Sequence, residues 1–176
     1  MRNLLIYRLL IVNAIGLMLL AAAAMEGFVG MLLKGDISHV IYVIVALFIV
    51  GLGSVFVRAR KVSSALNDIK AGKSVVINGP KFLEKNAHIE DICTWLVTLS
   101  LLGNIIGFAI AVSGQHDLSS SEGLLRLANQ FMSGMVVAFF TTIAGLIFAL
   151  WLDINRRVLK TATVAMLEDC RGKGAQ

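Results

Sequence analysis

The chain has 176 residues, of which 57% are hydrophobic and 15% are charged, with a net charge of +5. Soluble domains are usually about 45–50% apolar and about 25% charged, so this composition excludes an ordinary soluble protein and indicates lipid as the solvent. A positive net charge can indicate nucleic-acid binding. In membrane proteins it reflects Lys and Arg gathered on the cytoplasmic side, and we expect no nucleic-acid partner.

Four stretches of the chain are long and apolar enough to cross a bilayer as helices. A spanning helix needs roughly 20 mainly apolar residues, because no water is present to satisfy its backbone polar groups. In chain order, the stretches are Leu4–Met25 and residues 39–57, 92–113 and 131–152. The sequence predicts an all-α integral membrane protein in which residues 1–176 form a single membrane domain.

The first stretch also has features of a secretory signal peptide. Arg2 and Arg8 lie near its start, and small residues, Ala22 to Ala24, lie near its end. A basic start, an apolar middle and small residues before the cleavage site are typical of a segment that is removed after insertion. We expect a retained span, with cleavage as the alternative.

Basic residues near the span ends alternate between the two sides of the membrane. The segments after the first and third stretches contain one each, Lys34 and Arg126. The other segments are rich in them: Arg2, Arg8, Arg58, Arg60, Lys61, Lys70, Lys73, Lys81, Lys85, Arg156, Arg157, Lys160, Arg171 and Lys173. Since cytoplasmic segments carry the excess of Lys and Arg, both termini and the short loop 58–91 are expected to be cytoplasmic.

The connecting segments contain helical signals of their own. Apolar residues recur at helical spacing after the second stretch: Val62, Ala65, Leu66 and Ile69. The second span is therefore expected to continue as an amphipathic helix that stops near Gly72, and residues 81–91 are expected to lead as a helix into the third. Ser119 and Glu122 have the spacing of a capping box, which predicts a helix that runs into the fourth span.

Small residues recur at spacings of three and four in the third and fourth stretches. They include Gly103 and Gly107 in the third stretch, and Gly134, Ala138 and Gly145 in the fourth. Small residues on one face allow helix backbones to approach closely in lipid. These five residues are therefore candidates for the packing of two inner helices.

Three polar residues lie near the middle of the same two stretches, namely Asn104, Thr141 and Thr142. An unpaired amide is costly in lipid, whereas a threonine hydroxyl can bond to its own helix. Such groups could line a narrow polar path or could join helices by hydrogen bonds, and the residues alone leave both readings open.

The middle of each stretch lacks Asp and Glu. Asp91 and Asp153 lie at the cytoplasmic ends of the third and fourth stretches, and we expect Asp153 to be an interfacial charge beside Arg156 and Arg157. A proton or sodium relay normally needs an ionisable group inside the membrane. If this chain moves ions, the titrating group must come from another subunit.

The sequence has no pattern typical of an enzyme. His39, His88 and His116 lie on separate segments, with neither a metal-ligand spacing nor a nucleophile–base arrangement. We expect no enzymatic activity, no metal and no cofactor.

Short motifs in the last two stretches resemble those of one family. In residues 134–146, Thr142 lies three residues before Gly145, and residues 101–108 read Leu-Leu-Gly-Asn-Ile-Ile-Gly-Phe. Residues 155–157 read Asn-Arg-Arg. These patterns resemble the last two spans of the MotA/TolQ/ExbB family and the basic exit that follows them in TolQ and ExbB. The resemblance covers about residues 95–157.

The chain departs from that family at three places. Asn104 stands where the family usually has Thr in the third span. Val137 stands where TolQ and ExbB carry a Glu, five residues before the last-span Thr. The loop 58–91 is short, whereas flagellar stator A subunits have a large cytoplasmic region that pushes a rotor.

The resemblance implies an A-type subunit of a proton- or sodium-driven motor or energy-transducing complex in the bacterial cytoplasmic membrane. Such subunits have four spans with both termini inside, and they form a pentamer around two single-span B subunits whose Asp takes and releases the ion. Thr142 would then face that carboxylate, with Thr141 and Asn104 nearby. The alternatives are a structural membrane subunit and a small transporter or channel without motor activity.

The charge alternation predicts which positions a membrane-impermeant thiol reagent reaches. In a chain whose two cysteines are replaced by serine, Asp117→Cys is expected to react from the outside, and Lys73→Cys and Lys85→Cys only from the cytoplasmic side. Labelling of position 117 only from the cytoplasmic side would contradict the predicted orientation.

Overall fold

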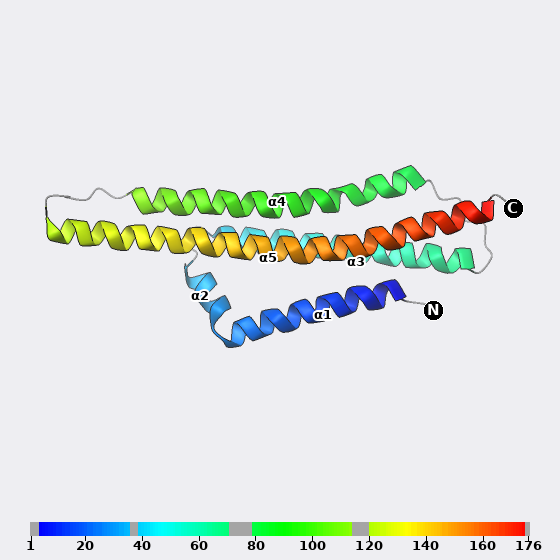
Figure 1. Ribbon diagram of the computed structural model, residues 1–176, viewed down its shortest axis with the longest axis horizontal. Helices are drawn as coiled ribbons and strands as arrows, with labels where there is room; N and C mark the ends of the chain where they lie inside the picture. The colour runs from blue at the N-terminus through cyan, green and yellow to red at the C-terminus, as the bar shows by residue number, and fades with distance from the viewer. Residues whose placement is uncertain (1–3, 36–38, 71–78, 114–119, 175–176) are drawn as a thin grey trace. The chain divides into compact units, whose positions relative to one another are not determined.

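The computed structural model describes residues 4–35, 39–70, 79–113 and 120–174, and these residues form helices without any strand (Figure 1). The helices of the described residues are α1 (Leu4–Met25), α2 (Phe28–Gly35), α3 (Val40–Lys70), α4 (Gly79–Val112) and α5 (Ser121–Gly174). The predicted all-α class is confirmed for this part of the chain.

Among the described residues, four helices are long and apolar enough to cross a membrane. These candidate spans are Leu4–Met25, Val40–Asp68, Ala87–Val112 and Ser121–Glu168. Each candidate span includes one of the four predicted stretches, except that the second and third stretches extend one residue beyond it at one end. The chain is therefore a helical protein with the composition of a multi-pass membrane protein.

Two of the approximate span ends lie one residue outside the observed helices. The second stretch was expected to start at His39, but His39 has a φ of 57° and α3 begins at Val40. A left-handed residue cannot continue a right-handed helix, so His39 lies outside it. The third stretch was expected to reach Ser113, but α4 ends at Val112, and the Ser113 hydroxyl donates to the Ile110 carbonyl over 3.0 Å.

Three helices run beyond the apolar stretches. α3 continues to Lys70, as the apolar spacing predicted, while the predicted stop near Gly72 lies outside the described residues. α4 begins at Gly79, so the helix expected over residues 81–91 and the third span are one helix. The continuation of α5 to Gly174 was not predicted. Its extension is supported by a buried stripe at helical spacing: Leu159, Thr163 and Met166.

The short helix α2 was also not predicted. It follows Gly27, which has a φ of 78° and donates its N–H to the Ala24 carbonyl over 3.0 Å. A left-handed glycine directly after the last turn commonly ends a helix, because it has no Cβ to clash with the backbone. Gly27 thus ends α1 and allows a second helix to start one residue later.

The start of α5 is capped by a different serine from the one expected. The Gly123 N–H donates to the Ser120 hydroxyl over 3.0 Å, which makes Ser120 the capping residue, and Ser119 lies outside the described residues. Glu122 is then one position too early to close a capping box. It forms an exposed ion pair with Arg126 instead, at 2.7 Å.

The chain divides into two compact units. The first comprises Met1–Leu19, Phe48–Cys93 and Leu150–Gln176, and the second comprises Leu20–Leu47 and Thr94–Ala149. Fully buried aliphatic residues form the core of the first unit: Leu9, Val55, Val62, Ile89, Leu152 and Leu159. Buried residues of the second unit include Ile44, Leu96, Ala111 and Val137. That all 176 residues form one membrane domain stays a prediction.

Candidate functional site

The backbones of α4 and α5 come into contact in the second unit. A Cβ added at Gly107 would lie 2.7 Å from both the Ala138 nitrogen and the Gly134 oxygen. A Cβ added at Gly134 would lie 2.5 Å from the Gly107 oxygen. Real side chains do not approach backbone atoms so closely. Glycine at both positions is therefore what allows the two helices to touch.

The contact continues in both directions along the two helices. A Cβ at Gly103 would lie 2.7 Å from the Thr141 hydroxyl oxygen, and one at Gly145 would meet the Ser100 side chain. Ala138 is buried and lies against Gly107. The structure thus brings all five residues singled out for inner-helix packing to one contact between α4 and α5.

Thr141 lies inside this contact. Its side chain is fully buried, and its hydroxyl donates to the carbonyls of its own helix, at 3.0 Å from Val137 and 3.1 Å from Ala138. Because the hydroxyl hydrogen of Thr141 is donated within α5, its side chain contacts α4 mainly by packing. It fills the space left by the missing side chain of Gly103. Ser100 behaves alike on α4, where its buried hydroxyl donates to the Val97 carbonyl over 2.7 Å.

Thr142 is more open than its neighbour. Its side chain is half-buried, and its hydroxyl donates to the Ala138 carbonyl over 2.9 Å. A hydroxyl oxygen has two lone pairs that can accept hydrogen bonds while its hydrogen is donated elsewhere. The Thr142 oxygen can therefore still accept a hydrogen bond from a group beside α5.

Asn104 follows Gly103 on α4 and is half-buried. Within the described part of the chain, its side-chain amide makes no hydrogen bond. An amide in the middle of an apolar helix is costly in lipid unless it is paired. Of the three polar candidates, Thr141 is closed within the α4–α5 contact, while Thr142 and Asn104 remain partly open.

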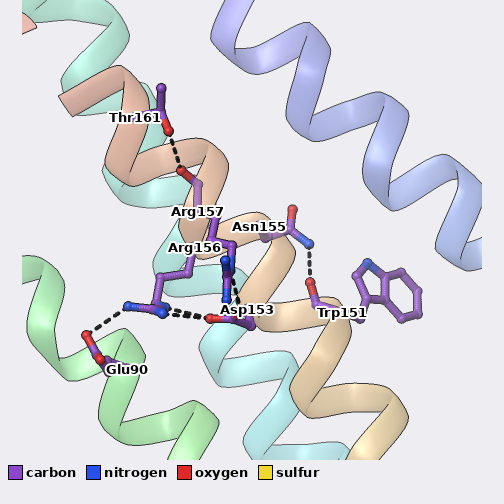
Figure 2. A network of polar contacts seen from close by, with 7 residues as sticks. All are labelled: Glu90, Trp151, Asp153, Asn155, Arg156, Arg157 and Thr161. Atoms are coloured by element: carbon purple, nitrogen blue, oxygen red, sulfur yellow. Dashed lines mark hydrogen bonds and ion pairs between the residues drawn. The ribbon is translucent and has the colours of Figure 1, made fainter. Parts of the chain in front are cut away.

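A cluster of charged residues joins α4 and α5 in the first unit (Figure 2). Arg156 contacts Asp153 at 2.7 Å and reaches Glu90 on α4 at 2.8 Å, and Arg157 contacts Asp153 at 2.7 Å. The two arginines surround Asp153 as expected. Glu90 was missed, because its pairing with Arg156 depends on the register of α4 against α5, which no local pattern in the sequence reveals.

None of the described His, Cys, Asp and Glu residues gather in a group of three or more that could hold a metal ion. Comparison of the chain with models of protein families, with curated proteins and with solved structures finds no match. The case for its family and its function therefore rests on its own residues.

The backbone contact predicts that one added methyl group at Gly107 destabilises the α4–α5 pair. Gly107→Ala is expected to lower the thermal midpoint in lipid nanodiscs, with a cost of about 1–3 kcal/mol, because the new Cβ cannot be accommodated without separating the helices. The matched control is Gly53→Ala on α3, where a Cβ would meet nothing within 4 Å. Equal midpoints for the two variants would contradict the tight contact.

Proposed function

We propose that this chain is an A-type subunit of the MotA/TolQ/ExbB family, working in an ion-driven motor or energy-transducing complex of a bacterial cytoplasmic membrane. In this proposal both termini are cytoplasmic, and five copies surround two copies of a single-span B subunit whose Asp carries the ion. The support from sequence is the motif resemblance over about residues 95–157, which includes Thr142, Gly145 and the Asn-Arg-Arg exit.

The observation that carries the proposal is that the α4–α5 contact leaves two polar side chains partly open. Backbone atoms at Gly107 and Gly134 close the contact, while Asn104 and Thr142 are half-buried in the middle of the two predicted spans. Lipid offers no hydrogen-bond partner for an amide. A partner from another polypeptide would satisfy Asn104, which favours an assembly over an isolated chain.

The polar groups fit a subunit that lines an ion path without titrating. The middle of each predicted span lacks Asp and Glu, so a carboxylate would have to come from the B subunit. The accepting oxygen of Thr142 can receive a hydrogen bond from a protonated carboxyl, or it can replace part of an ion's hydration shell. Thr142 is the better candidate to face the carboxylate, because Thr141 is enclosed between α4 and α5.

The backbone contact also suits a part that must transmit force. Helices whose backbones touch have little room to slide or tilt, because close-packed interiors are not easily compressed. An α4–α5 pair held in this way would move as one body when a B subunit rotates beside it. We propose protons as the driving ion. Sodium is the alternative, because the side-chain oxygens of Thr142 and Asn104 could coordinate it.

A structural membrane subunit is the second candidate. The specific observation in its favour is that both threonine hydroxyls donate to their own helix, at 2.9 to 3.1 Å. Hydroxyls of this kind also occur in helices that only pack. The two functions differ in whether Thr142 is needed for ion-dependent output.

The assembly is expected to contain five copies of this chain. The measurement is native mass spectrometry after the chain, expressed together with its proposed B subunit, is extracted into lipid nanodiscs. A monodisperse monomer under these conditions would exclude the motor assembly.

Replacement of Thr142 by valine is expected to abolish ion-dependent function and leave assembly intact. Valine nearly matches threonine in shape, and hydrogen bonds in lipid average only about 0.6 kcal/mol, so the fold should survive. An ion path that loses one polar group acquires a dry step. Thr141→Val is expected to have a milder effect. Ion flux or motor output is measured in cells that express both subunits, with recovery of the B subunit as the assembly check.

Thr98→Val on α4 is the matched control for Thr142→Val. Thr98 is exposed, and its hydroxyl also donates to its own helix, over 2.9 Å to the Thr94 carbonyl. Because Thr98 is not on the proposed ion path, Thr98→Val should leave the ion-dependent output unchanged. Normal output from Thr142→Val would show that this hydroxyl only packs, and the ion-path assignment would be withdrawn.

A further inference from the structure

A second polar cluster lies in the first unit, and its two α5 residues flank Asp153 of the charged cluster in the sequence. Asn13 of α1 and Trp151 and Asn155 of α5 are all buried, at 6%, 9% and 0% exposure. The sequence did not predict that any of these three residues joins α1 to α5. Buried amides are costly unless they are paired, so the question is how each polar group is satisfied.

Hydrogen bonds within the cluster use the polar atoms of all three side chains. The Asn13 amide nitrogen donates to the Asn155 side-chain oxygen over 2.8 Å and to the Leu9 carbonyl over 2.7 Å. The Trp151 indole N–H donates to the Asn13 side-chain oxygen over 3.0 Å. The Asn155 amide nitrogen donates to the Trp151 carbonyl over 2.9 Å (Figure 2). No buried side-chain nitrogen or oxygen of the described residues lacks a partner.

The surroundings of Trp151 are shaped to hold its ring against α1. A Cβ added at Gly16 would overlap the six-membered part of the indole, so only glycine leaves room for it. On its other side, Trp151 contacts Phe48 of α3, with ring centroids 5.0 Å apart. Shape and hydrogen bonding thus select the same placement of α1 on α5.

The cluster also fixes the register of these two helices. Asn13 lies in the middle of the first predicted span and Asn155 lies just beyond the end of the fourth, so their hydrogen bond requires the two stretches to be offset along the helix axes. Apolar side chains alone permit many sliding positions in lipid, because lipid tails are as apolar as the residues themselves. A slide of one turn would break the hydrogen bonds that Asn13 makes with Asn155 and with the Trp151 indole.

We propose that Asn13, Trp151 and Asn155 form an amide–indole lock that holds α1 on α5 in one register, so that α1 is a permanent helix of the folded protein. Removal of α1 would leave the indole N–H and the side-chain oxygen of Asn155 without their partners. The lock therefore argues for retention of α1 in spite of its likeness to a signal peptide. This inference is independent of the proposed motor function.

The first test uses the fluorescence of Trp151. The chain has two tryptophans, so a Trp95→Phe background reports on Trp151 alone. Asn13→Leu, which keeps the branched outline of the side chain and removes the acceptor, is expected to shift the emission maximum of Trp151. The matched control is Asn129→Leu, at an exposed position of α5, and it should leave the emission unchanged. An unchanged emission maximum in Asn13→Leu would overturn the lock.

The second test is a double-mutant cycle on thermal midpoints in lipid nanodiscs. Asn13→Leu and Asn155→Leu are each expected to lower the midpoint, because each removes the hydrogen bond between the two amides. The double variant should lose no more than the worse single variant. Strictly additive losses would show that the two residues do not act together.

Two further measurements address the placement of α1. The intact mass of protein purified from membranes through a C-terminal tag is expected to include α1, and a mass without it would overturn its retention. Two differently tagged copies are then co-expressed. If Asn13→Leu abolished their co-purification, Asn13 would pair with a neighbouring copy, and the lock within one chain would be refuted.

Discussion

The contact between the backbones of α4 and α5 is the constraint on which the second unit depends. Lipid supplies no hydrophobic drive for helices to associate, so van der Waals contact and hydrogen bonds must supply the attraction. Gly107 and Gly134 provide that contact by bringing main-chain atoms of the two helices together. Ser100 and Thr141 extend it with short side chains that bond to their own helices and therefore present no unsatisfied group to the partner.

Two side-chain amides in the predicted spans, those of Asn13 and Asn104, differ in their hydrogen-bond partners. Asn13 is paired with Asn155 and Trp151 and is buried in the first unit. Asn104 is half-buried and makes no hydrogen bond within the described residues. The same physical cost thus leads to a lock between helices in one place. In the other it leaves a polar group without a hydrogen-bond partner among the described residues.

The segment of α5 around Asp153 is held from two sides. Trp151 and Asn155 bond to Asn13 of α1. Arg156 reaches Glu90 on α4, as Figure 2 shows. An exposed ion pair such as that of Arg157 with Asp153 is individually weak, since water and salt screen it. The value of these contacts is geometric, because the charged groups on one side and the amides on the other leave this part of α5 little freedom to rotate.

The sequence by itself determined the helical class, the four apolar helices and the small-residue face on which Gly103 and Gly145 lie, because hydropathy and residue spacing are local properties. It could not reveal that Thr141 is enclosed while Thr142 stays open, or that Asn13 meets Asn155. Those facts depend on rotation and register between helices far apart in the chain, and apolar surfaces in lipid permit many such arrangements. Only the tertiary structure decided among them, through the fit of a few glycines and the pairing of buried amides.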